Sequence, residues 1–306
     1  MSRISAKLIR DARRISPFLP RLLPANRTIE QASLELKWIK QELPKEDWND
    51  AVNQRYQLVP LQYILGSQPF GELNIKCTQG VLIPRWETQK WCNKLVETLK
   101  QTHVKQLVVL DACTGTGCIP LLIGHELNNI APKIYGLDVS GKAFDLANEN
   151  LSLYKQRYPN NPIDLKFYLG DVFDAEIMDK LGLPKINLLT SNPPYIPYHD
   201  YIKSIDRDGV AKSVKLYEPS LALLGDGEFY RSLVQNILRP SQAEAFVFEI
   251  GYKNQADYVN FLLEDDSAWS IGVMKDSSNH IRCVLGWLNG SDFDGLKTLC
   301  DDVYVR

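Results

Sequence analysis

Several features that mark common classes of protein function are scarce in this chain of 306 residues. Its six cysteines include no C-x-x-C pair and its four histidines (His103, His125, His199 and His280) are scattered, which argues against a zinc site and a disulfide framework. Its longest apolar stretches have the length of a strand and fall well short of a membrane span. Its formal net charge of −2 offers no basic excess to draw it onto nucleic acid. We therefore expect a soluble globular protein with free thiols and no metal, membrane span or stable nucleic-acid complex.

The first 27 residues differ in composition from the rest of the chain. Seven of them are Arg or Lys, against a single acid, Asp11, and Ile4, Leu8, Ala12 and Ile15 fall on one helical face. An arginine-rich, acid-poor amphipathic segment resembles a mitochondrial transit peptide and not a secretory signal, which predicts a mitochondrial location. A surface helix of a small accessory domain in a cytoplasmic protein explains the same composition, so both interpretations stand.

The pattern along the chain predicts three regions. Short amphipathic helices fill residues 1–60, with Thr28 and Gln31 forming a capping-box pair at the start of one of them. Short alternating segments with glycines over 61–84 indicate a β-hairpin linker. Strands and helices alternate over 85–306, which is typical of an α/β fold with a mostly parallel sheet. Seven strands are predicted, at residues 107–110, 133–137, 165–169, 186–191, 245–250, 270–274 and 281–288.

A stiff tetrapeptide, Asn192-Pro193-Pro194-Tyr195, follows the fourth predicted strand. The prolines end the strand, and the carboxyl ends of parallel strands are where open α/β sheets bind their ligands. Asn192 supplies a side-chain carbonyl, the prolines supply backbone carbonyls, and Tyr195 supplies a flat ring. This set suits a planar –NH2 group, because the carbonyls accept its two hydrogens while the ring packs on its face. A proline-rich loop with a packed tyrosine is the plainer alternative.

Acidic residues lie at the ends of three predicted strands. Asp111 precedes a T-G-T-G turn, Asp138 ends the next strand, and Asp171 follows the third. Asp138 lies about 20 residues past the glycine turn, where an acid accepts the ribose hydroxyls of a nucleoside, although each acid alone also suits an N-cap or a surface. The phosphate-binding pattern G-x-G-x-x-G does not occur, because Pro120 follows the two glycines, so a nucleoside without pyrophosphate fits better. This favours S-adenosylmethionine as the cofactor, with Asp171 and Val172 at the adenine and Asp111 at the cationic amino-acid end.

Further motifs match a known family. They are Pro60-Leu61-Gln62-Tyr63-Ile64-Leu65-Gly66, Phe70-Gly71, Leu82-Ile83-Pro84-Arg85-Trp86-Glu87-Thr88, Ser191-Asn192-Pro193-Pro194-Tyr195-Ile196, Tyr217-Glu218-Pro219 and Phe248-Glu249-Ile250-Gly251. Through these motifs and the strand-end acids, from about residue 61 to 287, the chain resembles the HemK/PrmC group of class I S-adenosylmethionine-dependent methyltransferases. That family methylates the side-chain amide nitrogen (N5) of the glutamine in the Gly-Gly-Gln motif of class I peptide chain release factors. The basic leader makes the chain most similar to mitochondrial members.

The resemblance implies a Rossmann-like methyltransferase domain and gives roles to its site residues. Asn192, Pro193, Pro194 and Tyr195 are expected to bind the substrate glutamine, and Asn192, Pro193 and Tyr195 to take part in catalysis. The expected cofactor-binding residues are Asp111, Cys113, Thr114, Gly115, Thr116, Gly117, Asp138, Asp171, Val172 and Asn192. Two positions depart from the family. Cys113 stands where glycine is usual, so its β-carbon is expected to narrow the methionine site. Val172 replaces a larger aromatic residue, so weaker stacking on the adenine is expected.

Catalysis by placement is the expected mechanism, because no histidine or lysine lies beside Asn192 in the sequence to act as a base. The Asn192 side-chain oxygen and the Pro193 carbonyl are expected to accept the two amide hydrogens. The helices before residue 60 are expected to form a second contact surface for the release factor. The polar loop over 196–224 is expected to serve as a lid or to contact the substrate.

Two other functions are compatible with the sequence. N-P-P-Y also suits the exocyclic amines on which N6-adenine and N4-cytosine methyltransferases of DNA or RNA act, although the slightly acidic balance opposes this. A non-catalytic binding protein with a degenerate cofactor pocket at Cys113 is the alternative from another class. The intact acidic series and Asn192 oppose it.

Overall fold

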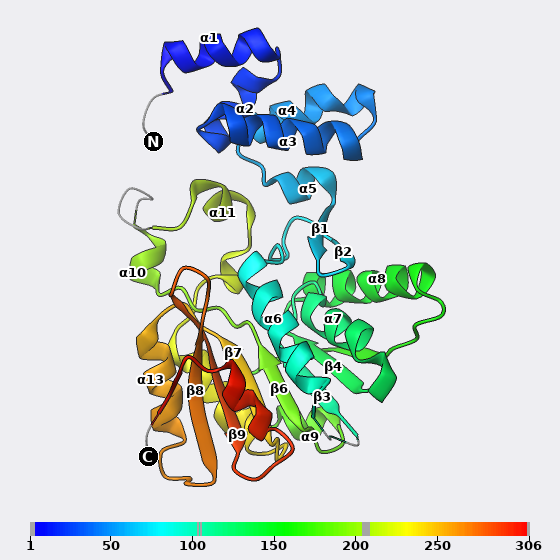
Figure 1. The fold of residues 1–306 in the computed structure, drawn as a ribbon, viewed down its shortest axis with the longest axis vertical. Helices are drawn as coiled ribbons and strands as arrows, with labels where there is room; N and C mark the ends of the chain where they lie inside the picture. Colours follow the sequence, from blue (N-terminus) through cyan, green and yellow to red (C-terminus); the bar gives the residue numbers. More distant parts are fainter. Residues whose placement is uncertain (1–3, 103, 105, 204–208, 305–306) are drawn as a thin grey trace.

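The computed structural model describes residues 4–102, 104, 106–203 and 209–304. Residues 1–3 of the basic leader, His103 and residues 204–208 of the polar loop lie outside that part of the chain. Within it, no helix combines the length and the apolar character that crossing a membrane requires. The amino-terminal helices stand at one end of the molecule and the large sheet at the other (Figure 1).

In the described part of the chain, five α-helices precede the first strand. They are α1 (Ala6–Ile15), α2 (Leu19–Asn26), α3 (Ile29–Glu42), α4 (Trp48–Tyr56) and α5 (Leu61–Leu65), with a 3-10 turn η1 (Lys45–Asp47) before α4. The Thr28 hydroxyl caps α3 by accepting from the Gln31 backbone N–H at 3.2 Å, which is one of the two bonds of the predicted capping box. These helices bury a cluster of their own, to which α2 contributes three buried leucines. The described part of the basic leader, residues 4–27, therefore packs into this region, although Ile15, predicted on the apolar face of α1, is 65% exposed.

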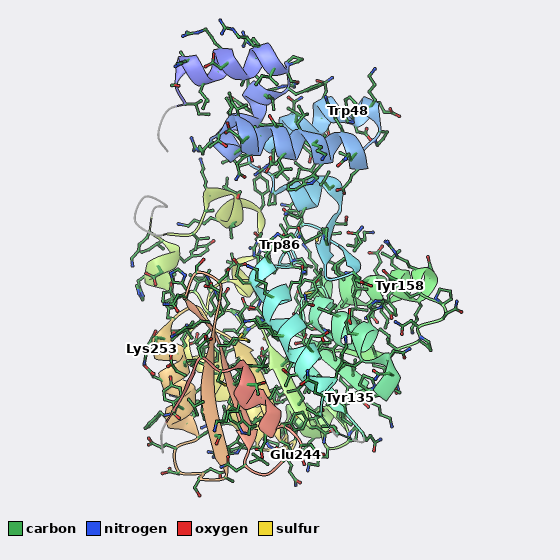
Figure 2. The ribbon with its side chains drawn as sticks, in the orientation of Figure 1. Trp48, Trp86, Tyr135, Tyr158, Glu244 and Lys253 are labelled. Atoms are coloured by element: carbon green, nitrogen blue, oxygen red, sulfur yellow. The ribbon has the colours of Figure 1, made fainter. Side chains whose placement is uncertain are left out.

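The segment between the helices and the sheet contains the predicted hairpin. Strands β1 (Ser67–Phe70) and β2 (Leu73–Lys76) pair antiparallel around Gly71, whose φ of +61° suits glycine. Residues 61–65, predicted as part of the hairpin linker, instead form α5. Leu61 is buried against the helical cluster, and this packing together with the fixed φ of Pro60 favours a helical turn there. The segment ends at Trp86, labelled in Figure 2, where α6 (Trp86–Leu99) begins.

The rest of the described chain forms an α/β sheet of eight strands in the order β10-β8-β9-β7-β6-β3-β4-β5. The strands are β3 (Val108–Ala112), β4 (Lys133–Asp138), β5 (Asp164–Leu169), β6 (Leu188–Ser191), β7 (Ala245–Glu249), β8 (Trp269–Lys275), β9 (Ile281–Leu288) and β10 (Asp302–Val303). β3 to β7 run parallel, whereas β8, β9 and β10 pair antiparallel with their neighbours. The seven predicted strands are confirmed. The eighth, β10, is an exposed edge strand of two residues, too short to give a periodic signal.

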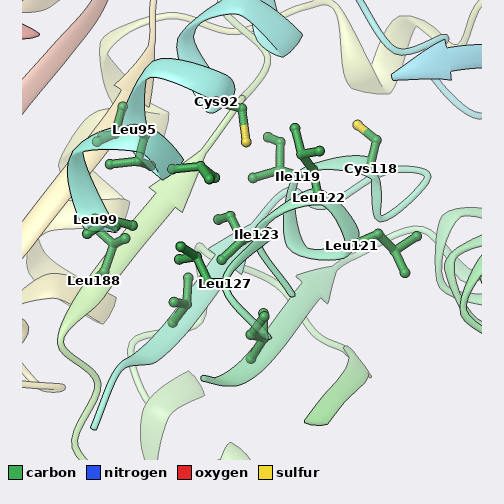
Figure 3. Close-up of a cluster of buried hydrophobic side chains, with 14 of the residues drawn as sticks. Cys92, Leu95, Leu99, Cys118, Ile119, Leu121, Leu122, Ile123, Leu127 and Leu188 are labelled. Atoms are coloured by element: carbon green, nitrogen blue, oxygen red, sulfur yellow. The ribbon is translucent and has the colours of Figure 1, made fainter. Parts of the chain in front are cut away.

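Helices pack on both faces of this sheet. Besides α6 they are α7 (Cys118–Glu126), α8 (Gly141–Arg157), α9 (Ile177–Leu181), α12 (Gly227–Ser232), the π-helical turn η5 (Leu233–Leu238) and α13 (Lys253–Leu262). One core cluster joins α6, α7 and α8 to the sheet, and Figure 3 shows Leu95 of α6, Ile123 of α7 and Leu188 of β6 within it. A second cluster joins η5 and α13 to the opposite face. The segment between β6 and α12 carries α10 (Tyr198–Tyr201), α11 (Lys212–Tyr217) and the turn η4 (Ser220–Ala222). Further 3-10 turns are η2 (Asn128–Ile130) and η6 (Asp294–Leu299).

Strand β3 lies between β4 and β6, so the order of the strands reverses at this point. The chain leaves β3 toward α7, on one face, and leaves β6 toward α12 and η5, on the other. Ligands of open α/β sheets bind in the crevice that such a reversal opens at the carboxyl ends of the strands. The T-G-T-G turn follows β3 and N-P-P-Y follows β6, so the fold brings both motifs to this crevice.

Candidate active site

A cavity opens at the carboxyl ends of β3, β4, β5 and β6. Eight of the ten residues predicted to bind the cofactor line it, namely Cys113, Thr114, Gly115, Thr116, Asp138, Asp171, Val172 and Asn192. Asp111 and Gly117 are not among the described residues that line it. Further walls come from residues 80–85, before α6, and from Pro219, Leu221 and Ala222, after α11. The described residues contain no group of three or more His, Cys, Asp or Glu side chains that could hold a metal ion.

The turn after β3 contains two glycines, Gly115 and Gly117, and each position favours glycine for a different physical reason. Gly115 has a φ of +56°, its N–H donates to Asp138 Oδ2 at 2.8 Å, and an added Cβ would meet nothing within 4 Å. It therefore leaves the cavity open. Gly117 has a φ of +77° and precedes α7, where an added Cβ would meet the Phe167 ring at 2.7 Å. This second glycine allows α7 to pack closely against β5 and does not face the cavity.

Asp138, at the end of β4, lines the cavity and is held by local backbone bonds. Oδ1 accepts from Ser140 N at 2.9 Å and Oδ2 accepts from Gly115 N at 2.8 Å. Burial raises the pKa of Asp138, and these backbone bonds oppose that rise. Each carboxylate oxygen keeps a lone pair for a further donor, so the group suits a pair of hydroxyls such as those of ribose.

The residues after β5 form the other end of the cavity. Asp171 Oδ1 accepts from Phe173 N at 2.9 Å, which leaves Oδ2 for an outside donor. Val172 is buried in the second core cluster while still lining the cavity. The rings of Phe173 and Phe229 meet edge to face with their centroids 4.8 Å apart, and both line the cavity. These two rings supply aromatic surface that the sequence analysis, which considered only Val172, did not identify.

Asp111, at the end of β3, is buried beside the turn that follows this strand. Its side chain is fully buried, with one carboxylate oxygen accepting from Thr114 Oγ1 at 2.6 Å and the other from Thr190 Oγ1 at 2.7 Å. Burial raises its pKa to about 7, against the opposing effect of these two bonds. Asp111 thus braces the turn after β3 against β6. Its expected contact with the cationic end of the cofactor stays a prediction.

Cys113 lines the cavity from a backbone conformation that L-residues rarely adopt, with a φ of +59°. This angle gives a physical reason for the glycine that the family usually has at the position. Burial raises the pKa of the Cys113 thiol, so the group stays neutral. The expected narrowing of the cavity by its side chain remains a prediction.

The N-P-P-Y segment faces the cavity with part of its length. Asn192 and Pro194 line the cavity, whereas Pro193 and Tyr195 are not among the described residues that do. The Asn192 side-chain amide donates from Nδ2 to Thr88 Oγ1 at 3.1 Å. Its Oδ1 accepts no hydrogen bond from another described residue, so the carbonyl remains free to act as an acceptor.

Glu249, at the end of β7, accepts hydrogen bonds from Thr88 and from Tyr195. Its Oε2 accepts from Thr88 Oγ1 at 2.6 Å and from Trp91 Nε1 at 2.7 Å, and its Oε1 accepts from the Tyr195 hydroxyl at 3.2 Å. Burial raises the pKa of Glu249, and the three hydrogen bonds oppose the rise. Burial likewise raises the pKa of Tyr195, so its phenol stays protonated. The sequence analysis quoted Thr88 and Glu249 within motifs but gave neither a role.

An ion pair connects two walls of the cavity. Arg85 Nη2 lies 2.7 Å from Glu218 Oε1, and Ile83 N donates to Glu218 Oε2 at 3.2 Å. The Glu218 side chain is 1% exposed and that of Arg85 is 32% exposed. The bond therefore ties the segment before α6 to the segment after α11. The I-P-R-x-E-T and Y-E-P blocks that carried the resemblance contain these residues, and that was the one signal for them in the sequence.

No family model matches the chain. The chain is 42% identical over 298 residues to the mitochondrial MRF1 N(5)-glutamine methyltransferase MTQ1 of Saccharomyces cerevisiae, a match that covers 94% of this chain and 89% of the relative. It is 36% identical over 295 residues to the probable MRF1 mitochondrial N(5)-glutamine methyltransferase mtq1 of Schizosaccharomyces pombe, covering 89% and 93%. Against a release factor glutamine methyltransferase of Thermodesulfovibrio yellowstonii the identity is 34% over 238 residues, covering 76% and 78%.

Solved structures share the fold. The N-terminal domain of human METTL16 in complex with SAH aligns with a TM-score of 0.52 at 16% identity, covering 84% of this chain and 95% of that chain. This likeness concerns the fold alone, and it confirms the predicted class I methyltransferase architecture. The identities to the curated relatives go further: the chain belongs to the family of N(5)-glutamine methyltransferases that includes the release factor glutamine methyltransferases.

Proposed function

We propose that the protein transfers a methyl group from S-adenosylmethionine to N5 of the glutamine in the Gly-Gly-Gln motif of a class I peptide chain release factor. The observation that carries the proposal is the placement of Asn192. It lines the same cavity as Asp138, and the bond from its Nδ2 to Thr88 leaves Oδ1 as the acceptor for an incoming amide. The relatives that are named as glutamine methyltransferases support the same reaction.

The residues of the cavity fit S-adenosylmethionine. Asp138 keeps lone pairs for two ribose hydroxyls, and Asp171 keeps one oxygen for the adenine amine. Phe173 and Phe229 offer aromatic surface to the base, and Gly115 leaves room beside the turn for the methionine end. When bound, S-adenosylmethionine supplies a methyl group on a positively charged sulfur.

The protein's own contribution is placement of the amide. A glutamine amide nitrogen is a poor nucleophile because its lone pair is shared with the carbonyl, and the described residues that line the cavity include no lysine or histidine to remove its proton. Asn192 Oδ1 and the Pro193 carbonyl accept the two amide hydrogens, and the Tyr195 ring packs on the amide plane. Such positioning supplies up to about 7–11 kcal/mol in favourable cases, and acceptors facing the charge that develops on nitrogen add a few kcal/mol. The proton leaves to water or a carboxylate after transfer.

Methylation of adenine or cytosine in nucleic acid is the competing proposal for N-P-P-Y. The net charge of −2 opposes it, because a protein that tracks a phosphate backbone needs clustered basic residues. The likeness to METTL16, at 16% identity, carries no information about substrate. We therefore propose a protein substrate and no stable complex with nucleic acid.

The helical region is our proposed second contact surface for the release factor. Leu34 and Trp38 lie one turn apart on α3 and are 44% and 40% exposed, so they are the apolar side chains that we propose for this contact. Replacing both by alanine is expected to lower kcat/KM for the whole release factor and to leave kcat/KM for a short Gly-Gly-Gln peptide unchanged. Equal effects on both substrates would contradict a docking role.

We retain the division of the chain into three regions, residues 1–60, 61–84 and 85–306, as a proposal. Leu61, at the start of the second region, packs on the first.

We propose a mitochondrial location, because relatives at 42% and 36% identity are named as mitochondrial and the leader over 1–27 is basic. The packing of α2 limits how much of this leader can be removed. Leu19, Leu22 and Leu23 are at most 1% exposed in the core of the helical region, so cleavage after them would open that core. We expect any cleavage before Leu19, and mass spectrometry of the mature amino terminus checks this.

The direct test incubates the protein with S-adenosylmethionine and a purified class I release factor and maps the product by tandem mass spectrometry. The expected product carries the mass of one added CH2 group on the glutamine of Gly-Gly-Gln, and a release factor with that glutamine changed to alanine stays unmodified. Transfer to DNA or RNA in parallel reactions, without transfer to the release factor, would contradict the proposal. Failure to bind S-adenosylhomocysteine in calorimetry would instead indicate a degenerate cofactor site.

A further inference from the structure

A chain of hydrogen bonds runs from the buried end of β7 to the cavity. Glu249 Oε2 accepts from Thr88 Oγ1 at 2.6 Å, and Thr88 Oγ1 accepts from Asn192 Nδ2 at 3.1 Å. Glu249 and Thr88 are 1% and 2% exposed, so water does not compete for these bonds. The same carboxylate accepts from Trp91 and from Tyr195.

The donors and acceptors available fix which group donates in each of these hydrogen bonds. The indole N–H of Trp91 only donates, so Glu249 Oε2 is an acceptor, and the same oxygen accepts the single hydroxyl proton of Thr88. The Thr88 oxygen then has lone pairs but no proton for Asn192. The Asn192 side chain must therefore present its NH2 group to Thr88, which turns its carbonyl oxygen away from Thr88 and leaves it for the substrate.

We propose that Thr88 and Glu249 are positioning residues that set which end of the Asn192 amide meets the substrate, an inference that rests on the proposed function. With the amide reversed, Asn192 would offer N–H groups to the N–H groups of the glutamine, and the substrate amide would lose its acceptor. Thr88 acts on Asn192 directly, and Glu249 acts through Thr88. Glu249 also accepts a hydrogen bond from the Tyr195 hydroxyl, so one buried carboxylate orients the side chains of both Asn192 and Tyr195.

Stability alone does not account for Glu249. Within the described chain no lysine, arginine or histidine forms an ion pair with it, and the nearby Arg282 is paired with Asp276 at 2.8 Å. A buried carboxylate held only by neutral donors is costly, because burial disfavours its charge. An apolar residue of similar volume often stabilises such a position more. What the carboxylate supplies, and an apolar residue does not, is a fixed direction for the hydrogen bonds around it.

The test compares Thr88→Val, which keeps the shape of the side chain and removes its hydroxyl, with Thr88→Ser, which keeps the hydroxyl. Thr98→Val, on the same helix α6 but away from the cavity, is the matched control. We expect Thr88→Val to lower kcat for the release factor by about 10- to 100-fold. Thr88→Ser and Thr98→Val are expected to stay within about threefold of wild type, and all three to bind S-adenosylhomocysteine with unchanged affinity.

A double-mutant cycle separates positioning from simple support of the fold. Because Thr88 acts through Asn192, Thr88→Val is expected to cost nothing further in an Asn192→Ala background. The proposal would be overturned if the double variant lost kcat by the product of the two single-variant losses. A Thr88→Val variant as active as the Thr98→Val control would overturn it as well.

Glu249→Gln tests the part of the hydrogen-bond network in which Glu249 acts on Asn192 through Thr88. The glutamine oxygen can still accept from Thr88 and Trp91, with its NH2 group turned to Tyr195, so a smaller loss of kcat than in Thr88→Val is expected. A Glu249→Gln variant as inactive as Asn192→Ala would show that Glu249 does not act through Thr88, which contradicts the proposal.

A readout without substrate keeps this inference distinct from the proposed function. In NMR spectra of the wild-type protein, the Asn192 side-chain amide protons are expected to exchange slowly with solvent, and Thr88→Val to speed that exchange while Thr88→Ser does not. Such a result, together with no methyl transfer to a release factor by the wild type, would refute the proposed function and support the positioning. Fast exchange in the wild type, together with normal methyl transfer, would refute the positioning alone.

Discussion

The two sides of the cavity are built by different kinds of contact. On the cofactor side, Asp138 is held by the backbone of Ser140 and Gly115, and Asp171 by the backbone of Phe173. On the amide side, Asn192 bonds to Thr88, a partner 104 residues away in sequence. The first set of bonds forms within a turn or between the ends of the neighbouring strands β3 and β4, whereas the second exists only once α6 and β6 have packed together.

This difference predicts that cofactor binding and amide placement respond separately to mutation. A turn that satisfies its own hydrogen bonds keeps its shape when a distant side chain changes. A network that spans α6, β6 and β7 depends on each member, because removing one leaves buried polar groups without partners. Variants on the two sides should therefore divide into binding defects and turnover defects.

The largest expected effect is that of Asn192→Ala, on the amide side. Loss of the acceptor for the substrate amide should lower kcat by at least about 100-fold. Calorimetry with S-adenosylhomocysteine should show affinity near that of wild type, since the cofactor side keeps its local bonds. A variant with near-normal turnover would refute the role given to Asn192.

Asp138→Ala should produce the opposite pattern. It removes the acceptors proposed for the ribose hydroxyls, so the dissociation constant for S-adenosylhomocysteine should rise by about 10- to 100-fold. At saturating cofactor, kcat should change much less than in Asn192→Ala. An equal fall in saturated kcat for both variants would show that the two sides of the cavity are not separable.

Asp111, which joins the turn after β3 to β6, should make the free energy of unfolding depend on pH. The pKa of Asp111 is raised by burial from 3.8 to about 7, so its neutral form is favoured in the folded state. Its contribution to stability is thus fully present below pH 3.8 and is lost as the pH rises through about 7. Between pH 5 and 7 the free energy of unfolding should fall by about 2 kcal/mol from this group. Asp111→Asn, which stays neutral, should flatten that part of the profile in denaturant titrations, and an unchanged profile would contradict the assignment.

The smallest expected effect concerns Cys113, which stands where the family usually has glycine. Cys113→Gly should relieve the strain of a φ of +59° and stabilise the protein by about 0.5–1 kcal/mol after the entropy cost of glycine is subtracted. It should also widen the methionine side of the cavity and raise affinity for S-adenosylhomocysteine. A loss of both stability and affinity would mean that the Cys113 side chain makes a contact that the cofactor needs.

The same contrast explains how much of the site could be predicted from the sequence. Asp138 and Asp171 were identifiable because a strand end and a turn are local patterns. The roles of Thr88, Arg85, Glu218 and Glu249 were not, because nothing in the residues around each of them names a partner more than 100 positions away. Motif resemblance marked these residues as noteworthy but did not say what they contact.

The fold was predictable to a similar extent. The strands of the sheet follow from apolar runs with regular spacing, and they were found where predicted. Helix α5 was missed because its five residues are helical only through the packing of Leu61 on the neighbouring helices. The contact of Asp111 with the cofactor stays a prediction, but its bonds to Thr114 and Thr190 could not be predicted for a related reason: Thr190 comes from another strand.

A crystal structure of the protein with S-adenosylhomocysteine and a Gly-Gly-Gln peptide tests the central claim most directly. The account predicts that the glutamine amide nitrogen lies within hydrogen-bonding distance of Asn192 Oδ1, while Asn192 Nδ2 still donates to Thr88. A glutamine side chain bound elsewhere, or an Asn192 amide turned with its NH2 group toward the peptide, would contradict it.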